Sequence, residues 1–336
     1  MKIRMPFLGV VAGVALVASA CGSSSSDAGG ASSDSLTIGY SSPVESQPSQ
    51  QDLITGLKTG AKSLGWKTDV IDANLSPDAQ VSNVQTMLQK KVDAISIWTL
   101  DAGAMQGTFA QAAAAKTPLI GVNSTGDQID TTVWWQLNLC KADDAPFKVA
   151  AQQFATWRPG GKIIMMGGPP VPSIQANVKC FTEAAKAAGL TVLSETDNVK
   201  DGSSSASALT SDLLSKYDDV DAFWAYNDAS ALGISAAVTQ AGKKISDGTS
   251  DGVIVTGANG DTDAIEAVKQ GRLTGTWDPQ ANATGLAVIK AVQDAKAGKA
   301  EKELVVESVF WSAENIDTYK KPGSRGYTLD TIPLVK

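Results

Sequence analysis

Residues 221–243 read DAFWAYNDASALGISAAVTQAGK. An apolar run of strand length comes first, and a stretch of small and apolar residues with helical spacing follows it over 229–242. The segment GVIVTGANG at 252–260 is again followed by a helical pattern, at 262–270. A strand that leads directly into a helix, and does so more than once, is typical of βαβ units and predicts a parallel sheet.

The same alternation extends toward the N-terminus. Further apolar runs of strand length lie at 36–40, 67–73, 94–98, 118–123 and 162–168. Helical patterns lie between them at 51–64, 76–91, 101–116, 143–157, 174–188 and 206–216. The strands are apolar on both faces, as sheets covered by helices on both sides require. The sequence therefore predicts an α/β fold, and a length of 336 residues predicts about two domains.

Composition excludes several classes of function. The chain has no histidine, which excludes Ser-His-Asp and Cys-His nucleophiles and HExxH zinc sites. No GxGxxG follows the first strand, and GxxxxGK[ST] is absent. The net charge is −7, whereas nucleic-acid-binding proteins typically carry an excess of basic residues. We therefore expect a protein without catalytic residues, cofactor, metal or nucleic-acid partner.

The N-terminus has the pattern of an export signal. Lys2 and Arg4 precede an apolar run over 6–20, which predicts a signal peptide over 1–20. The run ends in ASACG, and small residues before Cys21 resemble the lipobox of bacterial lipoproteins, which implies a lipid anchor on Cys21. The alternative is an ordinary signal peptide with a coincidental cysteine. Residues 21–35 are rich in Ser and Gly and predict a flexible tether.

Two cysteines remain in the exported chain, Cys140 and Cys180. The simplest interpretation is one disulfide, because an export signal places the chain outside the reducing cytosol. Two separate buried thiols are the alternative.

Polar side chains follow several of the predicted strands. Ligands of open parallel sheets bind beyond the carboxyl ends of the strands, so these positions are candidates for a binding site. They include Ser41, Trp98, Asn123, Gly167, Asn227 and Asn259.

An ordered set of segments resembles the type I periplasmic-binding proteins, the ribose- and galactose-type sugar receptors of ABC importers. The resemblance covers about residues 36–330. The segments are LTIGY (36–40), VSNVQTMLQKKVDAISIW (81–98), PLIGVNS (118–124), NDASALG (227–233) and VIVTGANGDTDAIEAVKQGRLTGTWDPQANATG (253–285). The resemblance implies two Rossmann-like lobes with parallel sheets, joined by a three-crossover hinge, with a ligand closed between them.

Position matching assigns the lobes. Lobe one would comprise 36–138 plus 280–308, and lobe two 139–279 plus 309–336. In the family, the places that correspond to Cys140 and Cys180 approach each other, which favours the disulfide.

At the positions that match the family's ligand contacts, this chain has mostly neutral side chains. Asn227 matches a family asparagine that bonds sugar hydroxyls, whereas Asn123 and Asn259 stand where the family has aspartates. A neutral amide both donates and accepts but lacks the charge-assisted bond of a carboxylate. Because most contact positions depart from the ribose receptor, the resemblance does not imply ribose as the ligand.

A sugar receptor needs planar amides or carboxylates around the ring and aromatic platforms on its faces. The predicted rim is Gln47, Gln50, Asn123, Gln175, Asn227, Asn259 and Asp278. The candidate platforms are Trp98 and Trp277, each of which could instead be a core residue. Trp134 and Trp135 would face opposite ways in a strand, with burial the favoured interpretation, and Trp224 is expected in the core. For Asp228, which follows Asn227, the favoured interpretation is a cap of the next helix instead of a ligand contact.

The combined expectation is an extracytoplasmic, lipid-anchored, monomeric receptor that captures a sugar or polyol and delivers it to an ABC permease. The alternatives are a chemosensory or signal receptor of the same fold, and a receptor for a small cation held by tryptophans. Lac-repressor-type regulators share this fold, but the export signal argues against them.

Overall fold

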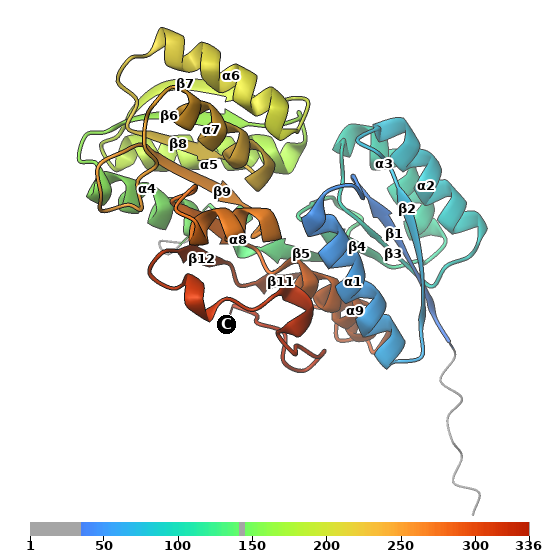
Figure 1. The fold of residues 1–336 in the computed structure, drawn as a ribbon. Helices are drawn as coiled ribbons and strands as arrows, with labels where there is room; N and C mark the ends of the chain where they lie inside the picture. Colours follow the sequence, from blue (N-terminus) through green and yellow to red (C-terminus); the bar gives the residue numbers. More distant parts are fainter. Residues whose placement is uncertain (1–34, 141–144, 336) are drawn as a thin grey trace, which may run out of the picture. The chain divides into compact units, whose positions relative to one another are not determined.

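The structure, a computed structural model, describes residues 35–140 and 145–335 (Figure 1). The signal peptide, Cys21 and the tether as far as residue 34 lie outside the described residues. The described residues form two six-stranded sheets flanked by helices, which confirms the α/β prediction. Among these residues, no helix is both long and apolar enough to cross a membrane.

The first sheet has the strand order β11-β5-β4-β3-β1-β2, and all of its neighbouring strands are parallel. Its strands are β1 (Thr37–Ser42), β2 (Lys67–Asp72), β3 (Ala94–Ile97), β4 (Leu119–Val122), β5 (Thr131–Trp135) and β11 (Glu303–Val306). The helices connected with it are α1 (Pro48–Ser63), α2 (Pro77–Gln89), α3 (Ala102–Ala114) and α9 (Ala281–Lys296).

The second sheet has the order β12-β10-β9-β8-β6-β7, and β12 alone runs antiparallel to its neighbour. Its strands are β6 (Lys162–Gly167), β7 (Thr191–Asp197), β8 (Ala222–Ala225), β9 (Ile254–Ala258), β10 (Gly275–Asp278) and β12 (Val309–Ser312). Its helices are α4 (Pro146–Trp157), α5 (Pro172–Ala187), α6 (Ser203–Lys216), α7 (Asp228–Gln240) and α8 (Thr262–Lys269).

Local signals in the sequence explain where several helices begin. The Ser76 hydroxyl accepts from the Ala79 N–H at the start of α2, and Pro77 occupies the first turn. At α7 the cap is Asn227, whose Oδ1 accepts from the Ser230 N–H at 2.9 Å. The interpretation that Asp228 caps this helix is therefore wrong, because Asp228 is already its first helical residue.

The chain passes between the two sheets three times before its final segment. It leaves the first sheet after β5, through the short 3₁₀ helix η1 (Gln136–Asn138), and returns between β10 and α9. It crosses again between β11 and β12. The final segment then turns back: η3 (Pro322–Ser324) contacts α1 and α9, and Leu334 forms a bridge with Val306 of β11. This part of 309–336, assigned by position matching to lobe two, packs on the first sheet's side.

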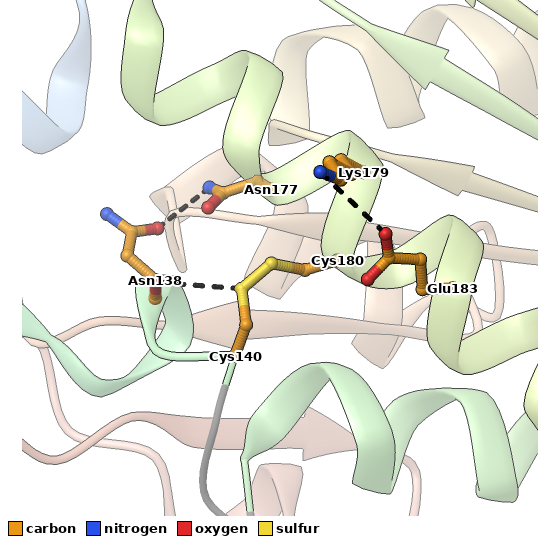
Figure 2. Close-up of a disulfide and its surroundings, with 6 residues drawn as sticks. All are labelled: Asn138, Cys140, Asn177, Lys179, Cys180 and Glu183. Atoms are coloured by element: carbon orange, nitrogen blue, oxygen red, sulfur yellow. Dashed lines mark hydrogen bonds and ion pairs between the residues drawn. A yellow bond between two sulfur atoms is a disulfide. The ribbon is translucent and has the colours of Figure 1, made fainter.

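Cys140 and Cys180 form a disulfide, with their Cα atoms 5.8 Å apart (Figure 2). The pairing confirms the disulfide prediction. It attaches the first crossing segment, just after η1, to the middle of α5.

Helices α1 and α9 approach each other through glycines (Figure 1). A Cβ added to Gly285 would collide with the Leu53 carbonyl oxygen, and one added to Gly56 would collide with that of Asn282. Backbone atoms cannot move aside as a flexible side chain can. The close contact therefore requires glycine at both positions.

We predict that Gly285→Ala lowers the free energy of unfolding by about 1–3 kcal/mol, because it overpacks this contact. Gly107→Ala in α3 is the matched control, since no atom lies within 4 Å of its added Cβ. Alanine there should be neutral or stabilise by up to about 1 kcal/mol through helix propensity. Urea unfolding of both variants tests this, and equal effects would contradict it.

Candidate ligand-binding site

A cavity of about 90 Å³ lies where the carboxyl ends of strands from the two sheets meet. One water needs roughly 10–15 Å³ of such space, so the cavity exceeds a single water site. The first sheet contributes the segment after β1, the residue after β3 and the end of β5. The second contributes the segments after β6, β7, β8 and β9.

Two tryptophans form the aromatic wall of the cavity. Trp98 and Trp135 meet edge to face, with ring centroids 4.7 Å apart. Trp98 Nε1 donates to Ser173 Oγ at 3.1 Å, and Trp135 Nε1 donates to Thr284 Oγ1 at 2.9 Å. Trp98 is 9% exposed, so it is part of the buried core and lines the cavity at the same time.

The other tryptophans follow the alternation of strand side chains. Trp134 points to the opposite face of β5 from Trp135. It is partly exposed, and its Nε1 donates to the Glu303 carboxylate. Trp224 is buried and stacks on Phe181, which confirms the prediction of a core residue.

Four predicted amides line the cavity: Gln47, Gln50, Asn227 and Asn259. Gln47 and Gln50 lie at the start of α1, and Asn227 and Asn259 follow β8 and β9. Gln50 Oε1 already accepts from the Tyr40 hydroxyl at 2.8 Å. Residues beyond the carboxyl ends of strands from both sheets therefore meet at one place, where open parallel sheets bind their ligands.

The remaining four predicted residues do not line this cavity. Asn123 faces a neighbouring hollow, and Gln175 is exposed on α5 beside another hollow. Trp277 packs against Phe310, near the side chains of α4. Asp278 is 2% exposed and accepts from Arg325 Nη2 at 2.5 Å and Trp311 Nε1 at 3.0 Å. A buried carboxylate needs such partners, and Asp278 is not among the residues that line the cavity.

The sequence did not predict Asp201, which is the only charged side chain among the described residues that line the cavity. Its carboxylate accepts from Gln47 Nε2 at 2.6 Å, from Asn227 Nδ2 at 2.7 Å and from the Tyr226 hydroxyl. Burial raises the pKa of Asp201 to about 6, although the bonds from Gln47 and Asn227 oppose the rise. The available signal was a polar loop, NVKDG, after β7.

Buried carboxylates also lie behind the site. Asp228 accepts from the Asp261 N–H at 2.8 Å and from the Thr276 hydroxyl at 2.6 Å. Burial raises the pKa of both Asp228 and Asp261. No group of three acidic or cysteine side chains is placed to hold a metal ion in the part of the chain that the structure describes.

Comparison with known proteins identifies the family. The family model described as "Periplasmic binding protein domain" matches residues 38–300. The chain belongs to the periplasmic binding protein family. The match confirms the resemblance to type I periplasmic-binding proteins of the sugar-receptor kind.

Relatives and solved structures agree with this family. The ribose import binding protein RbsB of Bacillus subtilis is 24% identical over 280 residues, or 79% of this chain and 83% of that protein. The xylitol-binding protein of Mycolicibacterium smegmatis is 26% identical over 270 residues, or 78% and 73% of the two chains. The Caulobacter myo-inositol binding protein shares the fold, with a TM-score of 0.74 and 21% identity over 86% of this chain and 97% of that one.

The raised pKa of Asp201 predicts a pH dependence of stability. Between about pH 4 and pH 6 the folded chain binds a proton that the unfolded chain does not, so this group lowers the free energy of unfolding as the pH rises. Asp201→Asn should remove that component. Urea midpoints of the wild type and the variant, measured across this range, test the sign, and identical pH slopes would contradict it.

The ion pair between Arg325 and Asp278 yields a second prediction. Both side chains are buried, at 7% and 3% exposure. Arg325→Met should cost about 3–5 kcal/mol in unfolding free energy, because it leaves the Asp278 charge buried and unpaired. The double variant with Asp278→Asn should recover a large part of the loss. Additive losses in this cycle would show that the two groups are not coupled.

Proposed function

We propose that this chain is an extracytoplasmic solute-binding protein that captures a neutral sugar or polyol between two lobes and delivers it to an ABC permease. The observation that carries the proposal is the cavity between the two sheets, with Trp98 and Trp135 as its aromatic wall and amides from both sheets around it. The names of its relatives, which include ribose and xylitol binders, agree with this ligand class.

The chemistry of the cavity favours a neutral polyhydroxy ligand. Hydroxyl groups donate and accept at once, as amides do, and the C–H faces of a sugar pack on aromatic rings. Asp201 is a charged acceptor, but three side chains of the protein already donate to it. A small cation would have to displace these donors. This supports a sugar or polyol over the cationic alternative.

The proposed lobes comprise 36–138 plus 280–308 and 139–279 plus 309–336, with the final residues returning to the first lobe. The proposed mechanism is hinge closure at the three crossings, with closure favoured by a ligand that contacts both lobes. Contacts between the sheets support it. Trp98 donates to Ser173 and Gln47 donates to Asp201. Leu75 and Leu100 form one apolar cluster with Val171.

Location and partners complete the proposal. The signal peptide over 1–20 and a lipid on Cys21 would hold the chain at the outer face of the cell membrane, with 21–35 as a tether. The protein would act as a monomer and as a binding protein without catalytic residues. A receptor with a role in signalling would use the same cavity. Measuring uptake of the bound compound by cells distinguishes a transport role from a signalling role.

Calorimetric titration of the purified protein with pentoses, hexoses, inositols and linear polyols tests the proposal. We predict binding of at least one of these compounds and a loss of about tenfold or more in affinity for Trp98→Ala, which removes one of the two rings of the aromatic wall. Trp66→Ala is the matched control. Trp66 directly precedes β2, so it lies at the amino ends of the strands of the first sheet, whereas the cavity lies at their carboxyl ends. Binding of amines alone, or of no compound, would contradict the proposal.

A further inference from the structure

A second hollow lies beside the cavity and shares Asn138, Ser173 and Asn177 with it. Its volume is about 190 Å³. Its lining comes from the ends of β3 and β4, from Trp134 of β5, from η1 and from the start of α5, and among the described residues that line it none has a charged side chain. The hollow therefore continues the cavity across the same gap between the two sheets.

The side chains that line this hollow include several buried polar atoms that have no hydrogen-bond partner. Ten such side-chain atoms occur among the described residues, and four of them belong to side chains that line this hollow. They are Thr99 Oγ1, Asn123 Nδ2, Asn138 Nδ2 and Asn177 Oδ1. A buried polar atom without a partner costs about 1–3 kcal/mol, so four together indicate a place that a polar molecule fills.

The contacts of these side chains fix which atoms remain free. Asn123 Oδ1 accepts from the Trp135 N–H at 2.8 Å, so its Nδ2 must be the free donor. Asn177 Nδ2 donates to Asn138 Oδ1 at 2.7 Å (Figure 2). If both of these amides were flipped, the pair would still present one free donor and one free acceptor.

The disulfide holds this amide pair in place. Cys140 lies two residues after Asn138, and Cys180 lies three residues after Asn177 on the same helix (Figure 2). The covalent link therefore limits how far the crossing segment can move from α5. A fixed pair of amides loses little conformational entropy when a ligand binds.

We propose that this hollow is a polar extension of the ligand site, in which Asn138 and Asn177 bind adjacent hydroxyl groups of a neutral sugar or polyol. A carboxylate would leave the Asn177 acceptor unpaired, and an ammonium group would leave the free donors of Asn123 and Asn138 unpaired. A hydroxyl satisfies both kinds of group, because it donates and accepts at once. This inference rests on the proposed function and adds the residues that select the hydroxyl pattern.

Titration of wild type, Asn138→Ala and Asn177→Ala with D-ribose, xylitol, myo-inositol and their monodeoxy analogues tests the inference. Each substitution should weaken binding of the best-bound compound about tenfold. One deoxy analogue should bind wild type about tenfold more weakly and lose little further affinity in Asn177→Ala, because the missing hydroxyl and the missing amide are partners. Gln175→Ala, two residues away but exposed beside another hollow, should bind as wild type does.

Each other outcome has a distinct meaning. If wild type binds one of these compounds and both asparagine variants bind it within about twofold, the inference is wrong and the proposed function stands. The same holds if, for every deoxy analogue, the loss of affinity relative to the parent compound is as large in Asn177→Ala as in wild type. Lower thermal stability with unchanged affinity also overturns the inference, since it shows a purely structural role. If wild type binds no sugar or polyol, the proposed function fails and the inference falls with it.

Discussion

Burial of the Asp278 carboxylate constrains the junction between the two sheets. The residue ends β10, immediately before the chain crosses to α9, and an unpaired charge there would be strongly destabilising. Arg325 from the C-terminal segment supplies the countercharge. Next to it, Gln280 Nε2 donates to the Glu307 carbonyl at 3.0 Å and accepts at Oε1 from the Tyr327 hydroxyl at 2.6 Å. The C-terminal segment thereby connects two of the three crossings.

This junction lies where the chain passes between the two sheets, and the candidate site lies where the carboxyl ends of these sheets meet. The cavity draws on loops that are far apart in sequence, and the disulfide fixes the remaining crossing against α5. Glycines in α1 and α9 let the first sheet's covering helices meet at backbone distance. Rigid sheets joined by three short segments are suited to opening and closing as two bodies.

Much of the fold could be predicted from the sequence, because buried strands and amphipathic helices leave clear patterns. The pattern at 51–64 corresponds to α1, and that at 94–98 to β3. Helix α9 was missed because ten of its sixteen residues are buried, which leaves no single apolar stripe. The edge strands β7, β11 and β12 are partly exposed. Most residues of β7 (TVLSETD) are polar, and the apolar runs of β11 (LVV) and β12 (VFW) are only three residues long, so none of them has a clear strand pattern.

The cavity lining was predictable at several residues that come just after central strands, such as Trp98, Asn227 and Asn259, whereas Asn123 after β4 lines the neighbouring hollow instead. Position matching failed to bring Gln175 to the cavity, because the direction of a helical side chain depends on a rotation that sequence does not specify. Asp201 is not predictable in this way, because it follows the edge strand β7, whose sequence has no continuous apolar run. Asn138 and Asn177 lie far apart in the sequence, and only the structure shows that their side chains form a hydrogen-bonded pair.

A crystal structure of the protein with a bound sugar or polyol tests the central claim most directly. The account predicts the ligand between the two sheets, in contact with Trp98 on one side and with side chains of the second sheet, such as Asn227 or Asn177, on the other. A ligand bound elsewhere, or held by one sheet's residues alone with the other sheet's loops out of reach, would contradict it.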